Sequence, residues 1–546
     1  MAPSDGAIAF ALAGLLAALI LVGPLAAQTI NVRGYLFTVT LPDSGDRIQG
    51  LAGVLLGPKP VADTIRLDLV GMTVDDVTGR IGMDTRVPVV FQYDGRVLSI
   101  VPSRAVTAVE ILYHGTPEDG LIIRANARGK RSVFGDNWPE RGRFWLPLVD
   151  HPSDKATVIF NVNAPTGWQV VGNGSAAKHQ INPRGSVTWS WNERHPIPTY
   201  TMVIGAGQFT ISHHRSVIDG SDTIPIDVWT YPEDSAYADS IPFKNATEIV
   251  ETLQRIVGPF PYEKLAHVES STRFGGMENS SAIFYAERPY VERRMREGVV
   301  RHETAHQWFG DAVTERDWHH LWLSEGFASY FDLVAGAALH GDSVLTTGMR
   351  GNAQSYLRSD VVDRPVIDTA QHDPLKLLNA NNYQKGAWIL HMLRGLVGDS
   401  VFFLGIREYY RRFRDSTALS EDFQQVMENA AGRQLEWFFQ QWLRQPGYPR
   451  LEASWRYDSA AHQVRMDLSQ VQSATWGAFR LPRLSVEIRG AGTAAVQRTV
   501  SVEGRRSIAI VDVPPSLTPG AVRIDPDGKL LLEATVTRTD GKAENH

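Results

Sequence analysis

The chain has 546 residues, which is too long for one hydrophobic core, so about two to four domains are expected. Hydrophobic residues make up 43% and charged residues 21%, the usual balance of a folded, soluble protein. The formal net charge of -6 and the lack of Lys/Arg runs offer no basic surface, so no nucleic-acid partner is expected. The absence of cysteine excludes disulfides, a cysteine nucleophile and a lipid-modified cysteine.

The N-terminus carries an apolar leader. Residues 6–27 are almost wholly apolar and end in Pro24 and small residues just before Gln28. This pattern predicts a signal peptide over residues 1–27 and export to the periplasm or the extracellular space. No Lys or Arg precedes the apolar run, and the run is long enough to span a bilayer. The alternative is therefore a membrane anchor through residues 6–27, and membrane contact is expected only in that case.

The rest of the chain changes its periodicity twice. Residues 28–213 show period-two alternation, as at Val158, Phe160 and Val162, which predicts an N-terminal β-domain. Residues 214–446 are dominated by helical spacing and include an apolar-faced helix predicted over residues 435–443. A Pro- and Gly-containing break follows, and residues 447–546 return to strand alternation, which predicts a small β-sandwich.

The most specific local motif is His302-Glu303-Thr304-Ala305-His306, an HExxH pattern typical of zinc peptidases. On a helix, residues four apart lie one turn above each other on the same face. Two imidazoles placed in this way reach one tetrahedral ion at about 2.0–2.1 Å. Glu303 lies beside a ligand without being one, so it is placed to act on water. The alternative for the motif alone is a chance match among 16 histidines.

Glu325 is predicted to be the third ligand. It follows His306 within the apolar segment WLSEGFA, where an unpaired buried carboxylate would be costly. A nearby cation removes that cost, and catalytic zinc sites use three protein ligands with one open position. The alternative is that Glu325 caps its own helix. His319 and His320 precede this helix and are predicted to hold loop positions or to support the ligands from outside.

Several motifs, in order along the chain, resemble the M1 family of gluzincin metallopeptidases, the group of aminopeptidase N and leukotriene A4 hydrolase. The resemblance rests on HETAHQWFGD and SEGFASYF, which carry the two histidines and the glutamate. It extends to LPLVDHP at residues 146–152, GGMEN at 275–279, YQKGA at 383–387 and WFFQQWLRQPGYP at 437–449. The likeness therefore covers most of the chain after the leader.

The resemblance implies a zinc-dependent peptidase that holds one Zn²⁺ per chain and acts on peptide substrates. It places the zinc on His302, His306 and Glu325 and makes Glu303 the general base. Tyr383 matches the family tyrosine that donates a hydrogen bond to the oxyanion of the tetrahedral intermediate. Without the resemblance, the favoured interpretation of Tyr383 is an aromatic side chain that packs at the start of a helix.

The GGMEN motif implies removal of N-terminal amino acids. Glu278 is expected to bind the cationic α-amine of the substrate. Gly275, Gly276, Met277 and Asn279 complete the predicted substrate-binding segment, which an extended peptide approaches as an added strand. The alternative for this motif alone is an ordinary turn. A second polar anchor, which the family supplies from the N-terminal domain, is ambiguous in residues 135–140.

The layout and the resemblance together predict a multidomain α+β fold. An N-terminal β-sandwich or saddle domain precedes a thermolysin-like α/β catalytic domain and a C-terminal immunoglobulin-like β-sandwich. No large C-terminal helical domain is expected, and an open cleft that admits longer peptides is a hypothesis. Two other functions stay open, namely an endopeptidase or bifunctional hydrolase and a non-catalytic binding or scaffold protein. The oligomeric state and the preferred first residue of the substrate are undetermined by the sequence.

Overall fold

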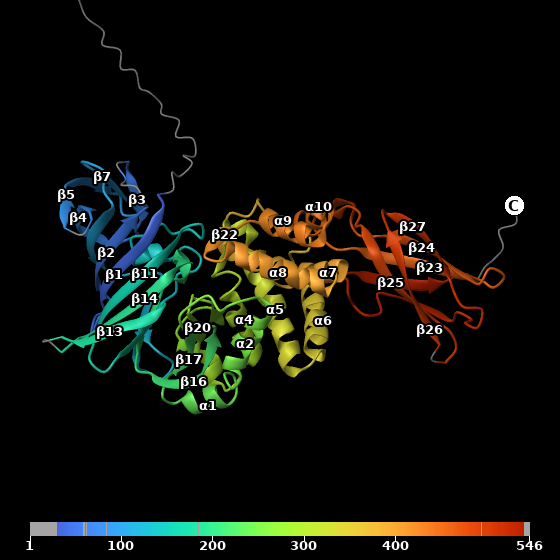
Figure 1. Cartoon of the computed structure of the whole chain (residues 1–546), viewed down its shortest axis with the longest axis horizontal. Coiled ribbons are helices and arrows are strands. Elements are labelled where there is room, and N and C mark those ends of the chain that lie inside the picture. The colour runs from blue at the N-terminus through green and yellow to red at the C-terminus, as the bar shows by residue number, and fades with distance from the viewer. Residues whose placement is uncertain are drawn as a thin grey trace, which may run out of the picture.

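The structure is a computed structural model that describes residues 30–57, 61, 63–82, 84–182, 185–492 and 494–539. The predicted leader, residues 1–27, lies outside the described residues. Figure 1 shows the described chain as three regions placed side by side along the longest axis. Blue and teal strands come first, a mixed region of helices and strands follows in green to orange, and red strands end the chain.

The N-terminal region contains three sheets, whose strands follow the predicted alternation. In β11 (Lys155–Ala164), Val158, Phe160 and Val162 are buried while Ile159 is exposed. The eight-stranded sheet has the order β13 (Ser175–Ile181), β14 (Val187–Pro198), β11, β1 (Val32–Thr40), β2 (Ile48–Leu56), β8 (Ala108–Gly115), β4 (Thr73–Ile81), β5 (Thr85–Val87). A four-stranded sheet has the order β12 (Gln169–Gly172), β15 (Ile204–Gly207), β10 (Arg131–Gly135), β9 (Leu121–Ala125). A three-stranded sheet has the order β3 (Ile65–Asp68), β7 (Val97–Pro102), β6 (Val89–Tyr93).

The middle region is built on a five-stranded sheet that the helical periodicity alone did not predict. Its order is β16 (Thr210–Asp219), β17 (Asp222–Thr230), β18 (Leu265–Ser270), β20 (Ala282–Ala286), β19 (Gly276–Met277). β18 is buried along its whole length, which is typical of a strand covered on both faces. β19 pairs antiparallel with β20 and forms the edge of this sheet. The domain division predicted between residues 213 and 214 falls inside β16.

Helices pack beside this sheet in the centre of Figure 1. They are α1 (Ser235–Ser240), α2 (Ala246–Ile256), α3 (Glu287–Val291), α4 (Glu297–His306), α5 (Trp322–His340), α6 (Ser343–Leu357), α7 (Gly386–Val397), α8 (Asp399–Phe413), α9 (Ser420–Ala431) and α10 (Glu436–Phe439). Two short strands, β21 (Val313–Glu315) and β22 (Ser416–Ala418), pair with each other in parallel. Instead of one regular helix over residues 435–443, α10 continues into a π-helical turn, η6 (Gln440–Arg444). A second π-helical turn, η5 (Asn381–Lys385), leads into α7.

The C-terminal region contains two sheets. One has the order β27 (Arg506–Asp512), β24 (Gln463–Gln470), β23 (Arg450–Asp458), β29 (Glu533–Arg538), and the other is β26 (Ala495–Val502), β25 (Leu481–Arg489), β28 (Ala521–Ile524). The predicted alternation appears in β25, where Leu484, Val486 and Ile488 are buried. The predicted break at residues 445–449 lies between the end of η6 and the start of β23.

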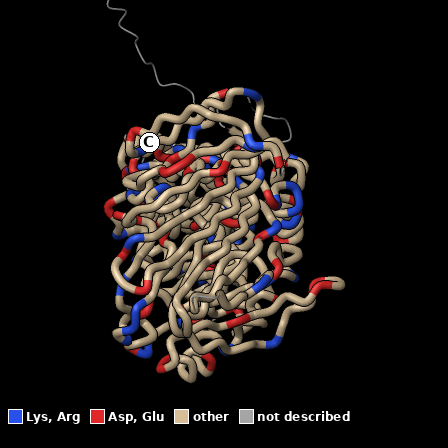
Figure 2. Tube along the Cα trace, turned by 90° about the vertical axis from the view of Figure 1, so that its left-hand side faces the viewer, with Lys and Arg blue, Asp and Glu red and all other residues tan. Residues whose placement is uncertain are grey.

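Charged residues of both signs are distributed along the described chain. Figure 2 shows Lys and Arg interspersed with Asp and Glu along the chain, in keeping with the small net charge. Among the described residues, no helix is both long and apolar enough to cross a membrane.

Candidate active site

Two packed helices bring the three predicted ligands together. α4 carries His302 and His306 one turn apart, and α5 carries Glu325. The Nε2 atoms of the two histidines are 3.2 Å apart, and each lies 3.4 Å from Oε2 of Glu325. Tetrahedral bonds of about 2.0–2.1 Å require ligand atoms about 3.3–3.4 Å apart. Oε2 of Glu325 is also buried without a hydrogen-bond partner in the described structure. The donor set therefore fits a zinc ion.

The surroundings of His306 orient it as a ligand. Its Nδ1 atom lies 3.1 Å from the carbonyl oxygen of Phe309 and 3.0 Å from Oγ of Ser324. A carbonyl oxygen only accepts, so we assign the proton of the neutral ring to Nδ1. Nε2 then keeps its lone pair for a metal.

Glu303 lies directly beneath the edge strand β19. A Cβ atom placed on Gly276 would lie 2.1 Å from Oε1 of Glu303, so the backbone there passes close to the carboxylate. Burial raises the pKa of Glu303 and the charge of Glu325 adds to this effect, while His302 and His306 oppose it. A carboxylate with a raised pKa is a better proton acceptor at neutral pH, as a general base requires.

Tyr383 projects into the same site from η5. Its hydroxyl donates a hydrogen bond of 2.6 Å to Oε1 of Glu325. Burial, together with the negative charge of Glu325, raises the pKa of Tyr383 well above its ordinary value. The hydroxyl therefore keeps its proton and remains a hydrogen-bond donor.

Glu278 is held in place through the backbone of its own segment. The side chain of Gln307 donates from Nε2 to the carbonyl oxygen of Glu278 at 2.8 Å and accepts at Oε1 from the backbone N–H of Ser281 at 2.7 Å. Glu278 as a residue is 6% exposed, and burial is the main cause that raises the pKa of its carboxyl group to about 7. The segment therefore includes the edge strand β19 and is hydrogen-bonded to Gln307 at the C-terminal end of α4. It is not the isolated turn that the GGMEN motif alone allows.

One cavity of about 190 Å³ collects these groups. Every predicted site residue lines it except Asn279, whose side chain is buried elsewhere. Trp138, Phe274 and Leu378 also line the cavity, and sequence reasoning missed all three. Trp138 and Phe274 meet edge to face with ring centroids 5.8 Å apart. No periodicity or motif in one sequence marks these apolar residues as lining a site.

The ambiguous stretch before the LPLVDHP segment supplies no second carboxylate to this cavity. Asp136 accepts from Oγ1 of Thr272 at 3.0 Å, and Asn137 accepts from Nε1 of Trp145 at 2.8 Å. Glu140 accepts from Nε1 of Trp318 at 3.0 Å. These polar side chains therefore contact protein groups outside the cavity.

His319 and His320 lie in a 3-10 turn, η3 (Trp318–His320), and contact groups outside the predicted metal ligand set. Nδ1 of His319 contacts Asp317, and its Nε2 lies 3.0 Å from the carbonyl oxygen of Gln371. Nδ1 of His320 lies 2.8 Å from Oγ of Ser420. Neither histidine lines the cavity.

Comparisons with known proteins agree with this geometry. The model of the peptidase family M1 domain matches residues 241–442, and the model of the peptidase M1 N-terminal domain matches residues 63–201. The chain is 24% identical over 438 residues to probable aminopeptidase 1 of Saccharolobus solfataricus, covering 76% of this chain and 53% of that protein. It is 27% identical over 407 residues to aminopeptidase N of Streptomyces lividans, covering 70% and 46%. The chain thus spans about half the length of these relatives.

A solved structure matches more completely. The crystal structure of an M1 zinc metallopeptidase from Deinococcus radiodurans superposes with a TM-score of 0.66 and 27% identity, covering 77% of this chain and 94% of that one. A mutant of the Deinococcus radiodurans enzyme, bound to a Tyr-Ser-Ala substrate, superposes with a TM-score of 0.66 and 25% identity, covering 76% and 94%.

Proposed function

The chain belongs to peptidase family M1, and from this membership we propose that it is a zinc-dependent aminopeptidase. The observation that carries the proposal is the position of Glu278, which lines the same cavity as His302, Glu303 and His306. A carboxylate fixed beside the reacting groups selects substrates with a free α-amine. Proteins of similar sequence that are named aminopeptidases support the same activity.

The chemistry divides among the residues of the cavity. We infer one zinc ion per chain, held by His302, His306 and Glu325, and when bound it supplies Lewis acidity toward a carbonyl and a water. Glu303 accepts the proton of the attacking water and delivers it to the leaving amine. Tyr383 turns its hydroxyl from Glu325 toward the oxygen on which negative charge develops.

Substrate binding follows from the edge strand and the aromatic wall. A peptide that lies along β19 forms backbone hydrogen bonds as an added strand, with its ammonium group on Glu278. Residues 135–140 add no carboxylate to the cavity, and among its described lining residues Glu278 is the carboxylate that is neither a zinc ligand nor the base. We therefore expect Glu278 to bind the amine. Trp138, Phe274 and Met277 give the cavity an apolar side, so we expect a preference for large apolar or aromatic first residues.

The remaining parts of the proposal concern the ends of the chain. We propose that residues 1–27 direct export, with an anchor through residues 6–27 as the alternative. Among the described residues, seven strands in two sheets support an immunoglobulin-like sandwich in the C-terminal region. A thermolysin-like catalytic domain is supported by the HExxH helix beside a mixed sheet.

The deciding experiment compares aminoacyl p-nitroanilides that carry either a free or an acetylated α-amine. We expect cleavage of the free amines alone, loss of activity on chelation, and recovery on zinc addition. Glu278→Gln should reduce the preference for free over acetylated amines, whereas Glu303→Gln should abolish cleavage of the free amines. Equal cleavage of both sets by the unmodified enzyme would favour the endopeptidase. No cleavage by zinc-loaded protein would favour the non-catalytic binding protein.

A further inference from the structure

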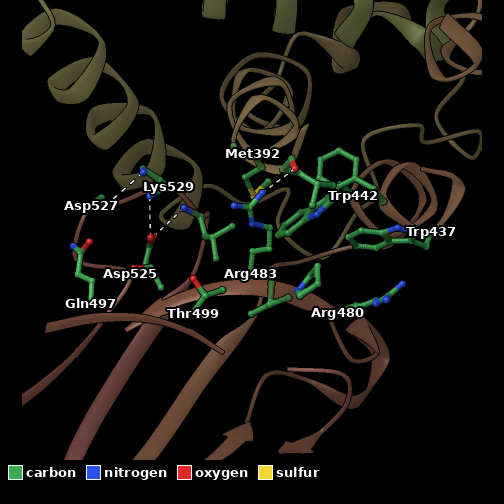
Figure 3. A pocket seen from close by; sticks show the side chains of 17 residues that line it. Met392, Trp437, Trp442, Arg480, Arg483, Gln497, Thr499, Asp525, Asp527 and Lys529 are labelled. Carbon is green, nitrogen blue, oxygen red and sulfur yellow. Dashed lines mark hydrogen bonds and ion pairs between the residues drawn. The ribbon is translucent and has the colours of Figure 1, made fainter. Parts of the chain in front are cut away.

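A second cavity lies between the catalytic helices and the C-terminal sheets. It has a volume of about 260 Å³ and shares no residue with the active-site cavity. Its lining comes from two sources (Figure 3). The helical side contributes apolar groups, including Met392 and Leu396 of α7, Trp437 of α10 and Trp442 of η6. The sheet side contributes charged and polar groups, among them Arg480, Arg483, Asp525 and Lys529. One wall is thus aromatic and the facing wall is charged.

Arg483 is the cation of this cavity that has no ion pair among the described residues. Among the described residues it makes a single hydrogen bond, from Nη1 to the carbonyl oxygen of Leu396 at 3.4 Å, and no ion pair. That carbonyl, in the last turn of α7, also accepts from Arg433 at 2.8 Å. Figure 3 shows the Arg483 guanidinium between Lys529 and Trp442. Most of its donors therefore remain available to a ligand.

The other charges of the cavity already have partners. Asp525 accepts from the backbone N–H groups of Lys529 and Leu530 at 3.0 and 2.9 Å. The Lys529 ammonium lies 3.6 Å from Asp527. Arg480 pairs with Glu503 at 2.9 Å, and its guanidinium lies over the ring of Trp437 at 4.8 Å. The Asp525 carboxylate has no ion pair among the described residues, but two backbone N–H groups occupy its oxygens. An incoming anion therefore finds free hydrogen-bond donors on Arg483.

We propose that this cavity is a binding site for a small carboxylate that carries an aromatic ring. The carboxylate pairs with Arg483, whose planar guanidinium matches the two oxygens of the group. The ring packs against the indoles of Trp437 and Trp442. A cavity of about 150 Å³ already accommodates benzene, so the volume here leaves room for a ring and a short acidic side chain. This site is independent of the proposed peptidase activity, because its residues lie outside the catalytic set.

Titration of the zinc-loaded protein with 3-phenylpropionate, followed by calorimetry, tests the site. Its neutral amide serves as the ligand control. We expect one molecule of the acid to bind per chain and the amide to bind about tenfold more weakly, because it cannot form the charge-assisted pair. Arg483→Gln should weaken the acid by a similar factor while peptide hydrolysis stays unchanged. Trp437→Leu should weaken both ligands, since Trp437 is half-buried and offers the exposed ring.

Arg498→Gln is the matched control variant. Arg498 is exposed on β26, where its neighbours Gln497 and Thr499 line the cavity and strand alternation directs Arg498 to the other face. This variant should bind 3-phenylpropionate as the unmodified protein does. Equal binding of acid and amide, full binding by Arg483→Gln, or no binding up to about 10 mM would overturn the proposal. If the acid bound to the zinc instead of this cavity, Arg483→Gln would still bind it in full. That result therefore distinguishes the zinc site from the second cavity.

Discussion

Gly276→Ala is expected to disable the general base without touching the metal ligands. The added Cβ atom would lie 2.1 Å from Oε1 and 2.6 Å from Cγ of Glu303, whereas ordinary contact begins at 3.4 Å. Glu303 must therefore move by more than about an ångström, and a misplacement of this size costs about 100-fold in rate. Loss of a general base altogether costs about 100- to 10,000-fold. We expect kcat/KM to fall within the lower part of this range.

The neighbouring glycine provides a matched control. A Cβ atom on Gly275 meets nothing within 4 Å, so Gly275→Ala should keep kcat/KM within about threefold. Both variants should bind zinc in full, because the atoms displaced by Gly276→Ala belong to Glu303 alone. The assays are hydrolysis of a leucine p-nitroanilide, zinc content by mass spectrometry, and thermal unfolding. The reasoning is refuted if Gly276→Ala retains near-normal activity, or if Gly275→Ala loses as much activity with zinc still bound.

Three further predictions follow from single contacts. Tyr383→Phe removes the hydrogen-bond donor, so kcat should fall about 100- to 1,000-fold with little change in KM, measured by steady-state kinetics. Trp138→Ala removes part of the apolar wall and should reduce kcat/KM for phenylalanyl more than for alanyl substrates; a uniform loss would contradict this role. Burial and the nearby Asp234 raise the pKa of Glu269 to about 9, so its folded form holds a proton that the unfolded chain releases above pH 4.5. The unfolding free energy should therefore fall as pH rises toward 9, by at most about 1.4 kcal/mol per pH unit. Glu269→Gln should flatten this dependence in denaturant titrations, and an unchanged slope would contradict the assignment.

The convergence of two proposed zinc ligands was predictable because HExxH fixes their spacing along the chain. His302 and His306 are one helical turn apart in any α-helix, so their convergence needs no tertiary information. The strands of the N-terminal region were predictable for a similar reason, since burial of one face imposes alternation. In β11 the buried and exposed positions follow that rule.

Other features of the fold required contacts between distant segments. The central sheet contains the fully buried β18 and the two-residue β19, and neither shows the alternation of a half-buried strand. A strand that is buried on both faces has no alternating polar positions, so its sequence lacks the period-two pattern by which a strand is predicted. The π-helical turn η6 likewise arises within a segment whose apolar spacing is that of an ordinary helix.

Sequence alone thus determined the chemistry of the site: a pair of imidazoles on one helix, a base beside them, and a buried carboxylate that needs a cation. Tertiary structure alone decided what surrounds that chemistry. Trp138 lines the first cavity from the N-terminal region, and Arg483 and Trp442 line the second cavity from different regions. These neighbours are far apart along the chain, and an isolated apolar or basic residue carries no periodic signal of its partner. The proposed substrate preference and the second cavity therefore depend on packing that only the folded molecule displays.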